Sequence, residues 1–203
     1  MPSWRLKNAA DVAARHKYTF YKPGADVIAQ IRPGENVKLI FLFDSSDPAA
    51  PEAERMWVVV DSIDGTGGFT GRLDNTPRWI ADLKPGDPVE FQEEHIISTE
   101  HDSADNIVNR YLLRCYVTQR VLRDGSPVGY LYREDRDNDR DSGWRLFAGD
   151  EGPEYMDDPD NVAFVSLGAV LNRDDSFLAL LESPVSSAFA RDPQTGQFRP
   201  VSR

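Results

Sequence analysis

The chain has 203 residues, of which 40% are hydrophobic and 28% are charged, and its formal net charge is -11. Four Trp, ten Phe and seven Tyr supply enough apolar surface for a folded core, which excludes global disorder. The excess of negative charge disfavours nonspecific binding to nucleic acid or to an anionic membrane, and it favours a basic partner.

The N-terminal residues lack a basic segment followed by an apolar one, so we expect no signal peptide. No apolar run approaches 18 residues, so we expect no membrane span. Cys115 is the only cysteine, which excludes an internal disulfide and a multi-cysteine zinc site. These features predict a cytoplasmic protein, in which Cys115 is a small core residue rather than a nucleophile.

The first half of the chain is predicted to be mostly β-structure with short helical pieces near its start. Its apolar and alternating runs predict strands at residues 36–43, 55–63, 67–74 and 88–96. Between the second and third of these, "DGTG" is a hairpin signal. "IAQIRPGENV" (28–37) and "IADLKPGDPV" (80–89) echo each other, and each predicts a helical turn, a Pro-Gly turn and a strand. We interpret the echo as two similar turns within one domain rather than a duplication.

The second half is predicted to contain an antiparallel sheet with one or two short helices. "YLLRCYVTQRVL" and "PVGYLYRE" are predicted strands joined by a hairpin at Asp124-Gly125, followed by strands in "GWRLF" and "NVAFVSL". "DDSFLALLES" predicts a short helix that Pro184 ends. The predicted fold class is therefore α+β, with a small, partly open barrel-like β-rich domain at 1–97, a linker at 98–106 and the α+β domain at 107–203.

Four motifs of the second half resemble the DUF2185 family, also called immunity protein 33, over residues 115–192. They are "GYLYRE" (129–134), "DSGWRLFAGDE" (141–151), "EYMDDPDN" (154–161) and "LESPVSSAFARD" (181–192). In the first half, "FYKPGADVIAQIRPGENVKLIF", "ERMWVVV", "GFTGRLDN" and "LKPGDPVEF" resemble the DUF2314 family over 14–97. The first resemblance implies a protein that binds and silences a cognate bacterial toxin. The second implies a small β-rich domain.

The acidic stretch that follows residue 134 admits several functions. Asp135, Asp137 and Asp139 have the spacing of the first calcium ligands of an EF-hand, but Arg140 stands where glycine is needed and Leu146 where glutamate is needed. Carboxylate catalysis would need two carboxyl groups in unlike environments, and no histidine or lysine accompanies them. We therefore expect no metal, no cofactor and no catalytic residue.

Binding of a basic protein accounts better for the concentration of charge. Residues 122–162 hold twelve acidic and five basic residues. Such a patch accelerates encounter with a cationic target, and lasting affinity needs aromatic anchors as well. The predicted partner-binding residues are Asp137, Asp139, Asp141, Trp144, Asp150, Glu151, Glu154, Tyr155 and Asp157. A solvated loop with Trp144 in the core is the structural alternative.

The leading hypothesis is thus a non-enzymatic, cytoplasmic immunity-type protein that neutralises a basic toxin. A ligand- or metal-responsive regulatory module and an unrecognised enzyme are the alternatives. The sequence predicts no nucleic-acid or membrane partner, and it leaves the oligomeric state open.

Overall fold

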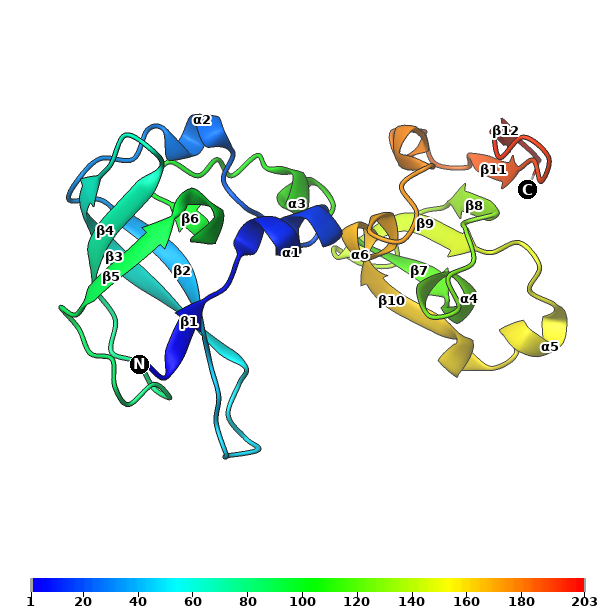
Figure 1. Ribbon diagram of the computed structural model, residues 1–203. Coiled ribbons are helices and arrows are strands. Elements are labelled where there is room, and N and C mark those ends of the chain that lie inside the picture. Colours follow the sequence, from blue (N-terminus) through cyan, green and yellow to red (C-terminus); the bar gives the residue numbers. More distant parts are fainter. Residues whose placement is uncertain (1, 203) are drawn as a thin grey trace. The chain divides into compact units, whose positions relative to one another are not determined.

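Figure 1 presents the computed structural model of the protein, which describes residues 2–202. The chain divides into two compact units, of which unit 1 ends at Ala104 and unit 2 begins at Asp105. Residues 98 and 99, which open the predicted linker, are the last two residues of a strand in unit 1. All five lysines of the chain lie in unit 1, so the basic side chains of unit 2 are arginines alone.

Unit 1 is built on an antiparallel sheet in the order β1-β2-β3-β4-β5, and β6 pairs with β2 as well. Because β5 leads into β6 through one 3-10 turn, the sheet is nearly closed into a barrel. Phe41, Val58 and Phe91 pack in its centre. The elements are β1 (Trp4–Leu6), α1 (Ala9–Arg15), α2 (Ala25–Ile28), β2 (Asn36–Phe43), β3 (Ala53–Ile63), β4 (Gly68–Leu73), β5 (Pro88–Gln92), η1 (Glu93–His95) and β6 (Ile96–Thr99).

The turns of unit 1 follow from local chemistry. The predicted hairpin joins β3 and β4, where Asp64 accepts hydrogen bonds from the amides of Thr66 and Gly68 and Gly67 has a φ of +90°. At the first echoed turn, the amide of Arg32 donates to Glu35 Oε2 at 2.9 Å. In the second echoed turn, the amide of Lys84 donates to Asp87 Oδ2, also at 2.9 Å. The glycines of the two turns have φ values of +96° and +87°, which only glycine adopts easily. The structure has no helix at residues 80–83, where the sequence predicts a helical turn before the second Pro-Gly turn.

Unit 2 is a mixed sheet in the order β10-β7-β9-β8-β11-β12, with short helices beside it. The α+β class is confirmed, but the predicted antiparallel sheet is wrong at one place, because β7 and β9 are parallel. The elements are α3 (Ile107–Arg110), β7 (Arg114–Thr118), α4 (Gln119–Leu122), β8 (Tyr130–Arg133), β9 (Asp141–Phe147), α5 (Pro153–Met156), η2 (Pro159–Asn161), β10 (Val162–Ser166), α6 (Leu167–Leu171), η3 (Leu178–Leu180), β11 (Ala188–Arg191) and β12 (Phe198–Pro200).

Two further local predictions for unit 2 are corrected. Asp124-Gly125 does not close a hairpin, because β7 ends at Thr118 and α4 follows, so the chain leaves the sheet before it reaches β8. Gly125 instead takes a φ of +77° after that helix. The helix predicted in "DDSFLALLES" is a single 3-10 turn at Leu178–Leu180.

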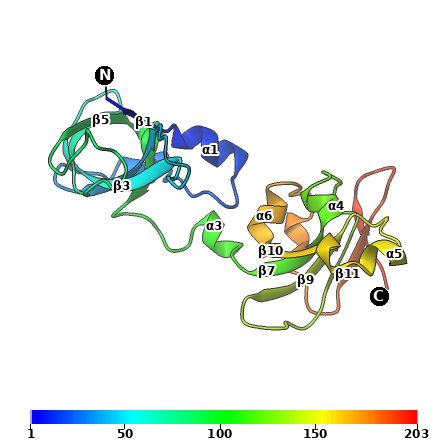
Figure 2. The same cartoon turned by 90° about the horizontal axis from the view of Figure 1, so that it is seen from below.

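The sheet of unit 2 has two unlike faces, because side chains alternate along each strand. Helices α4 and α6 lie over one face (Figure 2). On that side Cys115, Val117, Leu131 and Leu146 are buried. The side chains that alternate with them point to the opposite face, where several aromatic residues are only half-buried. Unit 2 therefore keeps one partly open sheet face.

Candidate partner-binding surface

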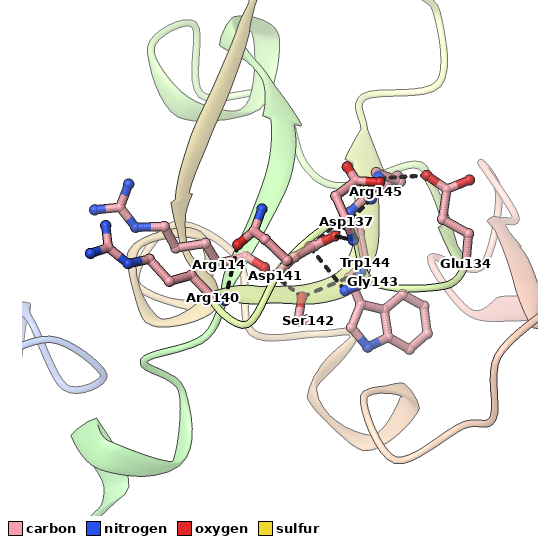
Figure 3. Close-up of polar contacts among 10 residues, drawn as sticks. Arg114, Glu134, Asp137, Arg140, Asp141, Ser142, Gly143, Trp144 and Arg145 are labelled. Atoms are coloured by element: carbon pink, nitrogen blue, oxygen red, sulfur yellow. Dashed lines mark hydrogen bonds and ion pairs between the residues drawn. The ribbon is translucent and has the colours of Figure 1, made fainter.

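A β-bulge at the start of β9 organises this region. Arg114 of β7 lies opposite Asp141 and Tyr116 lies opposite Arg145, so β9 uses two more residues than β7 over this interval. Gly143 supplies the bulge conformation with a φ of +82°, and a Cβ there would approach the carbonyl oxygen of Glu134 to 2.3 Å. The bulge brings the carboxylate of Asp141 back onto the guanidinium of Arg145 (Figure 3).

The guanidinium of Arg145 is the centre of an ionic cluster. It donates to both oxygens of Asp141 at 2.9 and 2.8 Å, to Glu134 Oε1 at 2.7 Å and to Asp137 Oδ2 at 3.2 Å. We call these four residues the Arg145 cluster (Figure 3). The side chains of Arg145 and Asp141 are 5% and 0% exposed, whereas those of Glu134 and Asp137 are 30% and 57% exposed. Three carboxylates around one guanidinium leave an excess of two negative charges.

The protonation of the cluster is fixed by its hydrogen bonds. Burial alone would raise the pKa of the Asp141 carboxyl, but hydrogen bonds from Arg145 and from the amides of Asp137 and Gly143 lower it to about 2. Burial would likewise lower the pKa of Arg145, but the bonds to Asp141 and Glu134 raise it above its ordinary value. Both groups are therefore charged at neutral pH.

Aromatic side chains flank this cluster on the partly open face of the sheet. Tyr116 pairs directly with Arg145, whose guanidinium lies 4.7 Å from the centre of the Tyr116 ring, and the Phe164 ring lies 4.8 Å beyond it. On the other side of Arg145, Tyr132 is its cross-strand partner, and the ring of Phe147 stacks on Tyr132 at 5.8 Å. A further tyrosine of β8 lies within 5.9 Å of both Tyr132 and Phe147.

These rings form a row across four strands, in which Arg145 lies between Tyr116 and Tyr132. We call it the aromatic row, and its members are Phe164, Tyr116, Tyr132, Phe147 and Tyr130. All five are half-buried. Tyrosine, phenylalanine and arginine are the residues that protein interfaces concentrate at their centres. The carboxylates of the Arg145 cluster lie beside this row.

The structure separates the predicted site residues into buried and exposed groups. Asp141 and Trp144 are 0% and 1% exposed, so a partner cannot reach them in the folded unit, and their predicted contact role is corrected. Trp144 is a core residue below the guanidinium of Arg133, which lies 5.8 Å from the Trp144 ring. Glu151 and Tyr155 are half-buried, whereas the remaining predicted residues are exposed, namely Asp137, Asp139, Asp150, Glu154 and Asp157.

Several of the acidic side chains serve the fold. Glu151 accepts hydrogen bonds from the Thr118 hydroxyl at 2.5 Å and from the Ala148 amide at 2.7 Å. Burial would raise the pKa of Glu151, but these bonds lower it. The carboxylate of Asp150 accepts from Arg120 Nη2 at 2.6 Å. The acidic stretch is therefore partly an internal network, and not an uninterrupted anionic face.

The sequence interpretation missed the aromatic row. The charge pattern indicates that Arg145 pairs with nearby carboxylates, but not that it is buried among three of them. The signal for the row was present, because Tyr130 and Tyr132 alternate with a buried leucine in "GYLYRE". Only the register of β7, β9 and β8 places these tyrosines beside Tyr116 and Arg145.

Other kinds of site find little support in residues 2–202. Within this range, no cluster of three or more His, Cys, Asp or Glu side chains has an arrangement that could hold a metal ion. Burial raises the pKa of the Cys115 thiol well above its ordinary range, so Cys115 is an inert core residue, as predicted. None of the helices in the same range has the length and apolar character that crossing a membrane requires.

Comparison with known proteins gives one match. Residues 115–202 match the family model described as the immunity protein Imm33 domain, and no curated protein or solved structure matches the chain. The matched range contains the Arg145 cluster and the whole aromatic row. The predicted resemblance to DUF2185 is confirmed, while that of residues 14–97 to DUF2314 stays a prediction. Most of unit 2 is therefore similar to the Imm33 immunity protein domain.

Proposed function

We propose that the protein is a non-enzymatic immunity protein that binds and neutralises a basic toxin through the open sheet face of unit 2. The aromatic row carries this proposal, because it is a set of half-buried rings on a rigid sheet. Such rings lose little conformational entropy on binding and contribute much apolar contact area. The match of residues 115–202 to an immunity protein domain supports a protein as the partner.

The charge around the row favours a cationic toxin surface. The Arg145 cluster has two excess negative charges, and Asp137 is its most exposed member. Asp135, Asp139, Glu154 and Asp157 add exposed carboxylates in the same unit. We propose that binding takes place in the cytoplasm, where a single buried cysteine needs no oxidising environment.

Replacing Tyr116 and Tyr132 together with alanine is expected to weaken toxin binding by about 30-fold or more, because hot-spot truncation typically costs about 2 kcal/mol or more. The measurement is calorimetric titration with an inactivated toxin domain encoded beside this gene. Trp57→Ala is the matched control, since Trp57 is a half-buried ring on a strand of unit 1. Equal affinities of the double variant and the parent protein would reject the proposed surface.

A variant in which four exposed carboxylates are replaced by amides is expected to associate with the toxin about tenfold more slowly at low salt, while its dissociation rate stays nearly unchanged. The four residues are Asp135, Asp139, Glu154 and Asp157. Exposed charges steer encounter over a Debye length but add little to short-range contacts. Stopped-flow association rates over a series of salt concentrations measure this. An association rate that neither falls in the variant nor depends on salt in the parent protein would contradict a basic toxin surface.

A further inference from the structure

A recess lies at one end of the aromatic row. It has a volume of about 560 Å³, and Tyr130 of the row forms part of its wall. Gly129, just before β8, and Gly149, after the end of β9, also line it. Gly149 has a φ of +94°, and a Cβ on Gly129 would approach the carbonyl oxygen of Ala148 to 2.0 Å. The close approach of the two chain segments requires glycine at position 129, and the positive φ favours glycine at position 149.

The remaining walls of the recess combine apolar surface with one exposed carboxylate. Pro127 and Ala190 supply apolar surface, and Asp150 supplies a side chain that is 60% exposed. Apolar walls suit the methylene groups of a long side chain, and an aromatic ring together with a carboxylate suits its cationic end.

The charges near the recess favour a cation over an anion. Arg120 contacts the carboxylates of both Asp150 and Asp124, at 2.6 and 3.8 Å, which leaves one excess negative charge. Arg191 also lines the recess, but its guanidinium donates to Asp174 at 2.6 Å and to the carbonyl oxygen of Val128 at 2.7 Å. An anionic ligand would therefore have to compete with internal partners for both arginines. The carboxylate of Asp150 also has an internal partner, but it is 60% exposed and can accept further hydrogen bonds beside the one from Arg120.

We infer that this recess receives one arginine side chain of the toxin, with the guanidinium on Asp150 and the methylene groups against Tyr130 and Pro127. This inference rests on the proposed function, because it names the group that the toxin presents at the edge of the same sheet face. A recess that reads a single side chain would add specificity to the affinity of the aromatic row.

The test is an amide-resolved NMR titration of the full chain with N-acetyl-arginine methylamide. N-acetyl-citrulline methylamide is the matched probe, since it has nearly the same shape and no charge. We expect saturable shifts of the Gly129, Gly149 and Ala190 amides, with a dissociation constant on the order of 1–10 mM. The uncharged probe is expected to bind at least about fivefold more weakly.

Asp150→Asn is expected to weaken binding of the arginine probe about fivefold or more. Glu182→Gln removes an exposed carboxylate of unit 2 outside the recess lining, and it is expected to leave probe binding unchanged. Equal binding of both probes, or no saturable shift at these amides, would overturn the inference. A silent recess combined with weakened toxin binding in the Tyr116/Tyr132 variant would reject the arginine recess alone. Arginine-probe binding combined with unchanged toxin affinity in that variant would reject the proposed surface alone.

Discussion

Replacing Arg145 with methionine is expected to lower the free energy of unfolding of unit 2 by about 3–5 kcal/mol. The substitution leaves the carboxylate of Asp141, whose side chain is fully buried, without its guanidinium partner. Methionine fills a similar volume, so the loss reflects an uncompensated charge and not a cavity. Urea unfolding followed through the reactivity of Cys115 measures the effect, because this single, buried thiol lies in β7 and reports on unit 2 alone.

The pH dependence of this loss separates charge from packing. In the parent protein the pKa of Asp141 is lowered to about 2, so its contribution of about 2 kcal/mol is present above pH 4 and is lost as the pH falls towards 2. Without Arg145, burial raises the pKa of Asp141, and protonation relieves the buried charge. The difference in stability between variant and parent should therefore shrink between pH 6 and pH 3.

Two further variants control this experiment. Arg110→Met removes an arginine of unit 2 whose pair with Asp105 is 60% and 73% exposed, and it is expected to cost at most about 1 kcal/mol. Combining Arg145→Met with Asp141→Asn should restore part of the loss, because no unpaired charge is then buried. A loss for Arg145→Met no larger than that for Arg110→Met would show that the Arg145 cluster does not hold β9 in place.

Replacing Trp144 with alanine is expected to destabilise unit 2 by about 3–5 kcal/mol, because the indole is 1% exposed and the substitution opens a large cavity. Trp144→Phe should cost less, since much of the packing is retained. Cys115 labelling in urea again gives the stability. The affinity of each variant for the toxin is measured without urea, where the variant is folded.

The same variants decide between a core residue and an interface anchor. Trp144→Phe is expected to leave toxin affinity within about threefold of the parent value, whereas truncation of the half-buried rings of Tyr116 and Tyr132 weakens it far more. A Trp144→Phe protein with parental stability and strongly reduced affinity would restore the predicted anchor role of Trp144.

The fold was predictable where the determinants are local. The alternating burial of β5 follows its alternating sequence, and the turn after β3 follows from Asp64 and glycine. The pairing of β7 with β9 was not predictable in this way, because a parallel neighbour is chosen by packing between segments distant in the chain. The Asp124-Gly125 signal failed because α4 turns the chain away from the sheet before that turn is reached.

The candidate surface shows the same division. Composition located the charged region, but it did not distinguish Asp141, which is buried against Arg145, from Asp139, which is exposed. That distinction depends on the bulge at Gly143, which brings the carboxylate of Asp141 onto the guanidinium of Arg145 in the same strand. The alternation of residues in β8 predicts that its tyrosines share one face of the sheet. Only the order of the strands reveals that they continue the row begun by Tyr116.

The absence of lysine from unit 2 determines how the molecule responds to acylating reagents. Succinimidyl esters react with primary amines and not with guanidinium groups, so side-chain coupling to a sensor chip or a biotin tag is confined to unit 1. Protein immobilised in this way presents Tyr116, Tyr132 and their surroundings chemically unaltered.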